Sequence, residues 1–195
     1  MIKRSEYQSA QLRAATMIRQ AGLAITEAEA QAIEVADFGL GRFEIEGAQV
    51  LTFFATERIS TKILVLFPRQ TLREHRNPPV GADPGKEEVI RVIAGAVHFY
   101  LPGEDGMREG WIPDGRDAWY TCRREVVLRP CDQLVVSPGT KHWFQAPASG
   151  AVMYSFSTCV RDGLDRFSDP AIVRLTQIIE DLPSAVSPGS VDRGS

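Results

Sequence analysis

The chain has few cysteines, and their number is odd. Among its 195 residues only Cys122, Cys131 and Cys159 are cysteines. Their spacing matches neither a zinc knuckle nor a disulfide framework, so a scaffold held by cross-links is not indicated. We therefore expect reduced, mostly buried thiols in a cytoplasmic protein.

One-sided charge and long apolar runs are also lacking. The net charge is −3 and no basic run occurs, which argues against nucleic acid as a partner. The longest apolar stretch, ILVLFP at residues 63–68, has the length of a strand rather than of a membrane span. The first residues, MIKRSEYQ, lack the apolar core of a signal peptide. The composition thus predicts one domain with a few added elements, located in the cytoplasm and without a membrane partner.

Helical patterns lie near both ends of the chain. At the start, Ser5 with Gln8 and Thr26 with Glu29 are typical of capping boxes, and apolar residues at helical spacing follow each pair as far as Gly22 and Gly39. Near the end, Asp169-Pro170 predicts the start of a helix that runs to Asp181. Its apolar stripe would be made of Ile172, Leu175, Ile178 and Ile179.

Between these helices the pattern is β-rich. Seven short runs, separated by turn residues, are predicted as strands: VLTFFAT, KILVLF, VIRVIAG, AVHFYL, REVVLR, QLVVS and AVMYSFS. Many short strands without intervening helices favour a closed barrel or sandwich. We expect an N-terminal helical arm over residues 1–49, a mainly β barrel over 50–160, and a C-terminal helix with a flexible tail over 161–195.

Histidine is scarce too, and two of the three histidines lie in informative stretches. His75 and position 77 are two apart on a predicted strand, so their side chains should point the same way. Six residues separate Glu88 from Gly95, where the strand can turn, and His142 follows a Ser-Pro-Gly turn. Two imidazoles and a carboxylate suit manganese, iron, nickel or zinc. We therefore predict a metal site at His75, Glu88 and His142, and a structural place for His98.

This spacing resembles the two-part cupin signature, H-x-H with E-x6-G and then P-G-x-x-H. More specifically, the words TKILVLFP, DPGKEE, TKHWFQ and FSDP resemble the D-lyxose isomerase family of cupins over about two-thirds of the chain. The resemblance implies a single cupin barrel with a divalent metal, usually manganese, with zinc, iron, cobalt and nickel as alternatives. It maps the metal ligands to His75, Asn77, Glu88 and His142.

The same resemblance assigns two lysines to catalysis. Lys62 and Lys86 match lysines that bind substrate oxygens or stabilise an enediolate in the family. Lys86 also precedes Glu88 by two residues, which would place it on the same face of a strand.

Two positions depart from the family pattern. Asn77 stands where a histidine is expected, and an amide oxygen is a weaker donor to a transition metal. Ser155 stands where the family carries the glutamate that serves as base, and a serine needs another group to activate it. Glu74, Glu87 and Asp162 are possible substitutes, although Glu74 and Glu87 should point away from the faces of His75 and Glu88.

The resemblance implies a metal-dependent aldose–ketose isomerase acting on D-lyxose and D-xylulose, or on D-mannose and D-fructose, and a homodimer. Because of the two departures, a sugar-binding cupin without turnover stays open. A repurposed metal cupin, such as a dioxygenase or an epimerase-like enzyme, is a third reading.

Overall fold

A computed structural model describes residues 1–158 and 162–181 of the chain. Its helices are α1 (Arg4–Gln20), α2 (Glu27–Gln31) and two short 3₁₀ helices, η1 (Asp117–Trp119) and η2 (Asp162–Leu164). Its strands are β1 (Ile2–Lys3), β2 (Glu34–Ala36), β3 (Ala48–Ala55), β4 (Ile59–Leu66), β5 (Thr71–Arg76), β6 (Glu88–Gly95), β7 (Val97–Leu101), β8 (Arg124–Leu128), β9 (Gln133–Val136), β10 (His142–Gln145), β11 (Ala151–Thr158), β12 (Arg166–Phe167) and β13 (Ile178–Ile179).

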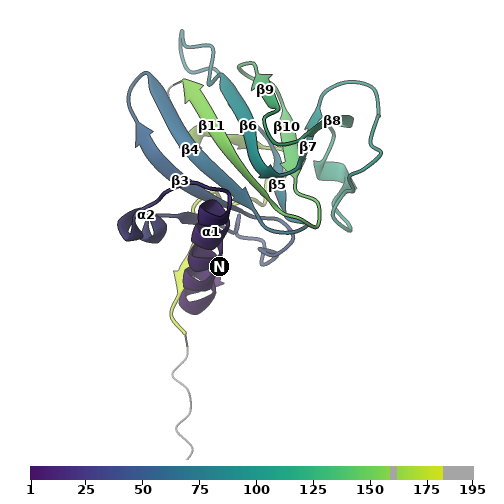
Figure 1. The fold of residues 1–195 in the computed structure, drawn as a ribbon. Coiled ribbons are helices and arrows are strands. Elements are labelled where there is room, and N and C mark those ends of the chain that lie inside the picture. The colour runs from purple at the N-terminus through teal and green to yellow at the C-terminus, as the bar shows by residue number, and fades with distance from the viewer. Residues whose placement is uncertain (159–161, 182–195) are drawn as a thin grey trace, which may run out of the picture.

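Two facing sheets form the barrel. The larger has the order β2-β3-β4-β11-β6-β9 and the smaller has the order β12-β5-β10-β7-β8, with all neighbours antiparallel. Figure 1 shows the larger sheet as one layer and the smaller sheet as the layer behind it. The expected cupin-type barrel is therefore confirmed, and all seven predicted strands are present.

A continuous apolar core fills the space between the sheets. Alternate residues of each strand point inward, as the period of two along a strand requires. The core includes Leu64, Ile90, Phe99, Phe144 and Met153. At Gly95 the backbone is left-handed and a Cβ would collide with the carbonyl oxygen of Gly150, so glycine permits the predicted turn there.

The N-terminal helices cover the outer face of the larger sheet at one end (Figure 1). Ala10, Ala14 and Ile18 of α1 pack with apolar residues of β3, β4 and β11. The capping box at Thr26 and Glu29 is confirmed. The one at Ser5 is wrong, because α1 begins earlier, after Lys3, whose backbone N–H donates to Glu6. The second helix is also shorter than predicted, since α2 ends at Gln31 and β2 follows.

The helix predicted for residues 169–181 is wrong. This segment is extended or turned and ends in β13, which pairs with β1 in parallel. Its backbone and side chains bond to neighbouring segments: Val173 N–H donates to Phe38 O, and the Thr176 hydroxyl donates to Val35 O. The tail predicted for residues 182–195 lies outside the described residues.

The structure tests the expected burial of two of the three cysteines and the expected lack of a membrane-spanning helix. Cys122 is a buried free thiol, whereas Cys131 is exposed, contrary to the expectation of mostly buried thiols. Cys159 lies outside the described residues. No helix in the described part of the chain is long and apolar enough to cross a membrane.

Candidate active site

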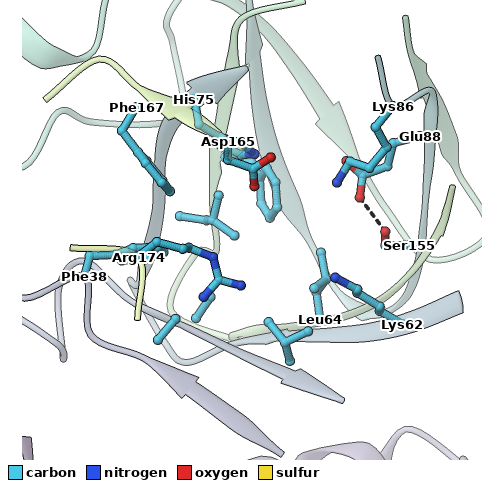
Figure 2. Close-up of a pocket in the computed structure, with 15 residues that line it drawn as sticks. Phe38, Lys62, Leu64, His75, Lys86, Glu88, Ser155, Asp165, Phe167 and Arg174 are labelled. Carbon is cyan, nitrogen blue, oxygen red and sulfur yellow. Dashed lines mark hydrogen bonds and ion pairs between the residues drawn. The ribbon is translucent and has the colours of Figure 1, made fainter. Parts of the chain in front are cut away.

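A cavity opens between the two sheets. It encloses about 570 Å³ of empty space, part of it continuous with solvent. Its polar wall consists of Lys62, His75, Lys86, Glu88, Ser155, Asp165 and Arg174, and its apolar wall of Ala36, Phe38, Ala48, Val50, Leu64, Leu72, Phe144 and Phe167. Figure 2 shows Lys86, Glu88 and Ser155 on one side, with His75, Asp165 and Phe167 on the other.

An irregularity in β5 aims His75 into this cavity. Leu72 pairs with Phe144 and His75 pairs with His142, so three steps along β5 match two along β10. The extra residue turns both Arg73 and Glu74 away from the cavity, as a β-bulge does. His75 then lines the cavity, and its ring lies 4.4 Å, centroid to centroid, from the ring of the buried His142.

Both imidazoles are oriented by a backbone carbonyl. Nδ1 of His75 lies 2.8 Å from Arg73 O, and Nδ1 of His142 lies 2.9 Å from Thr140 O. A carbonyl oxygen only accepts, so each Nδ1 carries the hydrogen. Burial, together with the nearby His75, lowers the pKa of His142 to about 3, which keeps that ring neutral at neutral pH. In a neutral ring with Nδ1–H, the Nε2 lone pair is left as a donor to a metal.

Glu88 is a buried anion. Burial alone would raise its pKa, but Lys86, His142, the Ser155 hydroxyl and His75 together lower the pKa to about 2. The Lys86 ammonium lies 3.3 Å from Oε2 of Glu88, and the Ser155 hydroxyl donates to Oε1. The predicted proximity of Lys86 to Glu88 is therefore confirmed.

A divalent metal suits the donor atoms of the predicted metal corner, which consists of His75, Glu88 and His142. Two neutral imidazole nitrogens and one carboxylate are a common set of three protein ligands in catalytic sites. Within residues 1–158 and 162–181, no three His, Cys, Asp or Glu side chains already stand at ligating positions around one point. The metal site at His75, Glu88 and His142 thus stays a prediction that rests on donor chemistry and proximity.

Asn77 lies apart from this corner. β5 ends at Arg76, and Asn77 lines a small neighbouring cavity instead, which shares Lys86 and Asp165 with the main one. Asn77 is buried, and its Oδ1 has no hydrogen-bond partner among the described residues. The structure therefore places His75 and Glu88 on the cavity wall and His142 next to His75, while neither His142 nor Asn77 lines that cavity.

Comparison with curated proteins decides the family. No protein-family model matches the chain. The chain is 45% identical over 175 residues to the D-lyxose ketol-isomerase of Cohnella laeviribosi, covering 89% of this chain and 96% of the relative. It is 42% identical over 179 residues to the D-lyxose/D-mannose isomerase of Thermosediminibacter oceani, covering 91% and 99%. The chain belongs to the D-lyxose ketol-isomerase family. As a member of that family, it is an isomerase.

Solved structures agree with this fold. The L-ribose isomerase of Cellulomonas parahominis superimposes with a TM-score of 0.76 at 17% identity, covering 91% of this chain and 98% of that one. The L-ribose isomerase of Geodermatophilus obscurus superimposes with a TM-score of 0.72 at 16% identity, covering 91% and 98%. At such identities the likeness establishes the cupin-like fold that this D-lyxose ketol-isomerase family member shares with them.

Lys62 lines the cavity, whereas Glu74 and His98 do not. Lys62 is 8% exposed, lines the cavity and pairs across the sheet with Ser155. Glu74 points away, as predicted, and its carboxylate accepts from Thr121, Cys122 and Ser168. His98 is buried outside the cavity, as expected of a core residue.

Sequence reasoning missed part of the wall of this family member's cavity. Phe38, Asp165 and Arg174 were not predicted to line a cavity, and Arg174 lies within the segment for which a helix was predicted. One signal was present for Asp165, because it precedes Phe167 of the FSDP word by two residues and so shares its face in an extended segment.

Proposed function

We propose that this isomerase is a metal-dependent aldose–ketose isomerase that interconverts D-lyxose with D-xylulose or D-mannose with D-fructose. The observation that carries the proposal is the cavity lined by the His75 imidazole, the buried Glu88 carboxylate and two lysines, with the His142 ring packed against that of His75. The names of the curated relatives at 42–45% identity support the substrate class.

His75, Glu88 and His142 would hold the metal, and manganese is the expected ion. When bound, a divalent metal supplies Lewis-acid stabilisation of negative charge on the C1 and C2 oxygens of the sugar. The neutral state of His142 and the anionic state of Glu88 suit that role, because a ligand must be deprotonated at the donating atom.

The lysines act on the sugar directly. Lys86, just before β6, and Lys62 of β4 line the cavity, and each can donate hydrogen bonds to sugar oxygens. Isomerisation places negative charge on O1 and O2, and an oriented ammonium beside them stabilises that charge. The apolar side chains Leu64, Leu72 and Phe144 exclude water around this charge, which strengthens its interaction with the lysines.

A sugar-binding protein without turnover is the second candidate. It is favoured by one residue: Ser155, at the position where the sequence resemblance expects the family's base, donates its hydrogen bond to Glu88. If no other group moved the proton, the cavity would bind a sugar and leave it unchanged.

A panel of pentoses and hexoses separates these candidates. Purified protein is supplied with manganese, incubated with each aldose and examined by NMR for ketose, while calorimetry measures sugar binding. We expect ketose from D-lyxose or D-mannose. Binding without ketose would favour the second candidate, and neither binding nor ketose would exclude both. The homodimer and the cytoplasmic location stay predictions that sedimentation and cell fractionation would check.

A further inference from the structure

The cavity extends beyond the residues that would hold the reacting end of a sugar. Figure 2 shows Lys86, Glu88 and Ser155 on one side of it. Phe38 and Arg174 lie on the other side. In an isomerase of the proposed function, on which this inference rests, negative charge develops on O1 and O2. C1 and C2 therefore belong beside the lysines and the predicted metal corner, and the remaining carbons extend toward Phe38 and Arg174.

Two apolar residues of the larger sheet form a floor for these remaining carbons. Val50 of β3 and Leu64 of β4 are partners in register, and both line the cavity. They are 8% and 7% exposed, whereas Met153, which follows Leu64 in the same row of the sheet, is fully buried. The residual exposure of Val50 and Leu64 indicates space over their side chains, which a bound chain of carbons would fill.

The spacing along the strands places Val50 beneath the far end of the sugar. Leu64 follows the cavity lysine Lys62 by two residues on β4, a step of about 7 Å, and Val50 lies beside Leu64. Five carbon–carbon bonds of about 1.5 Å each span less than about 8 Å. A sugar with C1 beside Lys62 therefore brings its fifth and sixth carbons over Val50.

A polar group borders the floor at the same level. Glu34 of β2 is the register partner of Val50 on the side opposite Leu64, and the Arg174 guanidinium donates to Glu34. Arg174 also lines the cavity, so its guanidinium lies next to the space over Val50. The surroundings of Val50 are thus apolar below and polar at the side, which suits a carbon that carries a hydroxyl.

We propose that Val50 sets the length of the sugar that this isomerase accepts. D-Lyxose and D-mannose share their configuration at C2, C3 and C4, and D-mannose has one carbon more. In this assignment the additional carbon of D-mannose packs against the Val50 side chain. A larger residue at position 50 excludes that carbon and leaves D-lyxose in place.

The test compares Val50→Ile with the unmodified protein by kcat/KM for D-mannose and for D-lyxose. The substitution adds one methylene and keeps the branched side chain that suits a strand. One methylene in a pocket changes discrimination between substrates by about tenfold to two-hundredfold. We therefore expect the ratio of kcat/KM for D-mannose to that for D-lyxose to fall at least tenfold. Val50→Thr, which keeps the size of the side chain, should leave the ratio within about threefold.

Val92→Ile is the matched control. Val92 belongs to the same apolar core, is buried and does not line the cavity. Crowding the core there should affect both sugars by the same factor, because it changes stability and not the space for the sixth carbon. Circular dichroism checks the fold of each variant, and Val50→Leu replaces Val50→Ile should the latter fail to fold.

The outcomes separate this assignment from the proposed function. If the unmodified protein isomerises neither sugar, the proposed function itself fails. If it isomerises both, an unchanged ratio in Val50→Ile, or an equal change in Val92→Ile, overturns the role of Val50. If it isomerises D-lyxose alone, the assignment requires Val50→Ala to gain turnover of D-mannose, and no gain overturns it.

Discussion

At the scale of single residues, both oxygens of the Glu88 carboxylate are bound by neighbouring side chains. Lys86 contacts one oxygen and Ser155 donates to the other, so the group is fixed in direction as well as in charge. A carboxylate held in this way can orient toward a metal, while Lys86 also lines the cavity proposed to bind the sugar. Lys86 thus links the predicted metal corner to the substrate.

Lys86→Met tests that link. Because the ammonium stabilises charge that develops on the sugar oxygens, kcat should fall by about a hundredfold or more. Manganese content should not change, since Lys86 is not a predicted ligand. Steady-state kinetics and metal analysis check both, with Lys3→Met, an exposed lysine, as control. Full activity in Lys86→Met would exclude this lysine from the chemistry.

Asn77 is the second residue to test. Its buried Oδ1 has no partner in the described structure, and it follows His75 by two positions. The sequence resemblance expects a ligand histidine at this position, and a histidine side chain is longer than that of Asn77, so we predict that Asn77→His raises manganese affinity by about tenfold or more. Metal titration at fixed pH measures the change. Equal affinities would show that position 77 does not reach the metal.

At the scale of elements, Glu74 ties three segments together behind the cavity. The carboxylate accepts hydrogen bonds from the backbone N–H groups of Thr121 and Cys122 and from the hydroxyls of Thr121 and Ser168. The loop before β8 and the segment after β12 are thereby fixed to β5. Because β5 carries His75 and β12 lies next to Asp165, this anchor supports the wall of the cavity that faces Lys86 and Glu88.

Glu74→Ala should lower the free energy of unfolding by about 2 to 3 kcal/mol at neutral pH, because buried donors lose their acceptor. Burial alone would raise the pKa of Glu74, but its hydrogen bonds lower it below the ordinary 4.5. Its contribution is therefore complete above that value and is lost as the pH falls through the lower folded-state pKa. Urea unfolding should show the gap between the two proteins closing at acidic pH. A gap that is independent of pH, or equal to that of the exposed Glu104→Ala, would contradict this.

The sequence predicted local patterns better than it predicted the C-terminal segment. The barrel strands and the positions of His75, Glu88, His142 and Lys86 could be predicted, because alternation and short motifs are local. The helix over 169–181 could not be excluded, since Ile172, Leu175, Ile178 and Ile179 fit a helical stripe. In the structure three of them are exposed, and the segment is held by partners distant in sequence. Asp165 and Arg174 reach the cavity only through those long-range contacts.

At the scale of the whole molecule, residues of the segment 162–181 complete the wall of the cavity. Asp169 lies within salt-bridge distance of both Arg73 and Arg116, and Arg73 also contacts the buried Glu46. These buried charges compensate one another, since each would be costly alone. The segment 162–181 is thereby docked on β5, and the residues that it brings, Asp165 and Arg174, finish a cavity that the two sheets alone leave open.

The most direct measurement of the central claim is a crystal structure of the manganese-loaded protein with anomalous scattering recorded at the manganese edge. The account predicts one ion inside the barrel, bound by His75, Glu88 and His142 at about 2.0 to 2.3 Å, within reach of Lys86. An active protein with its ion elsewhere, or with these three side chains pointing away from it, would contradict the account.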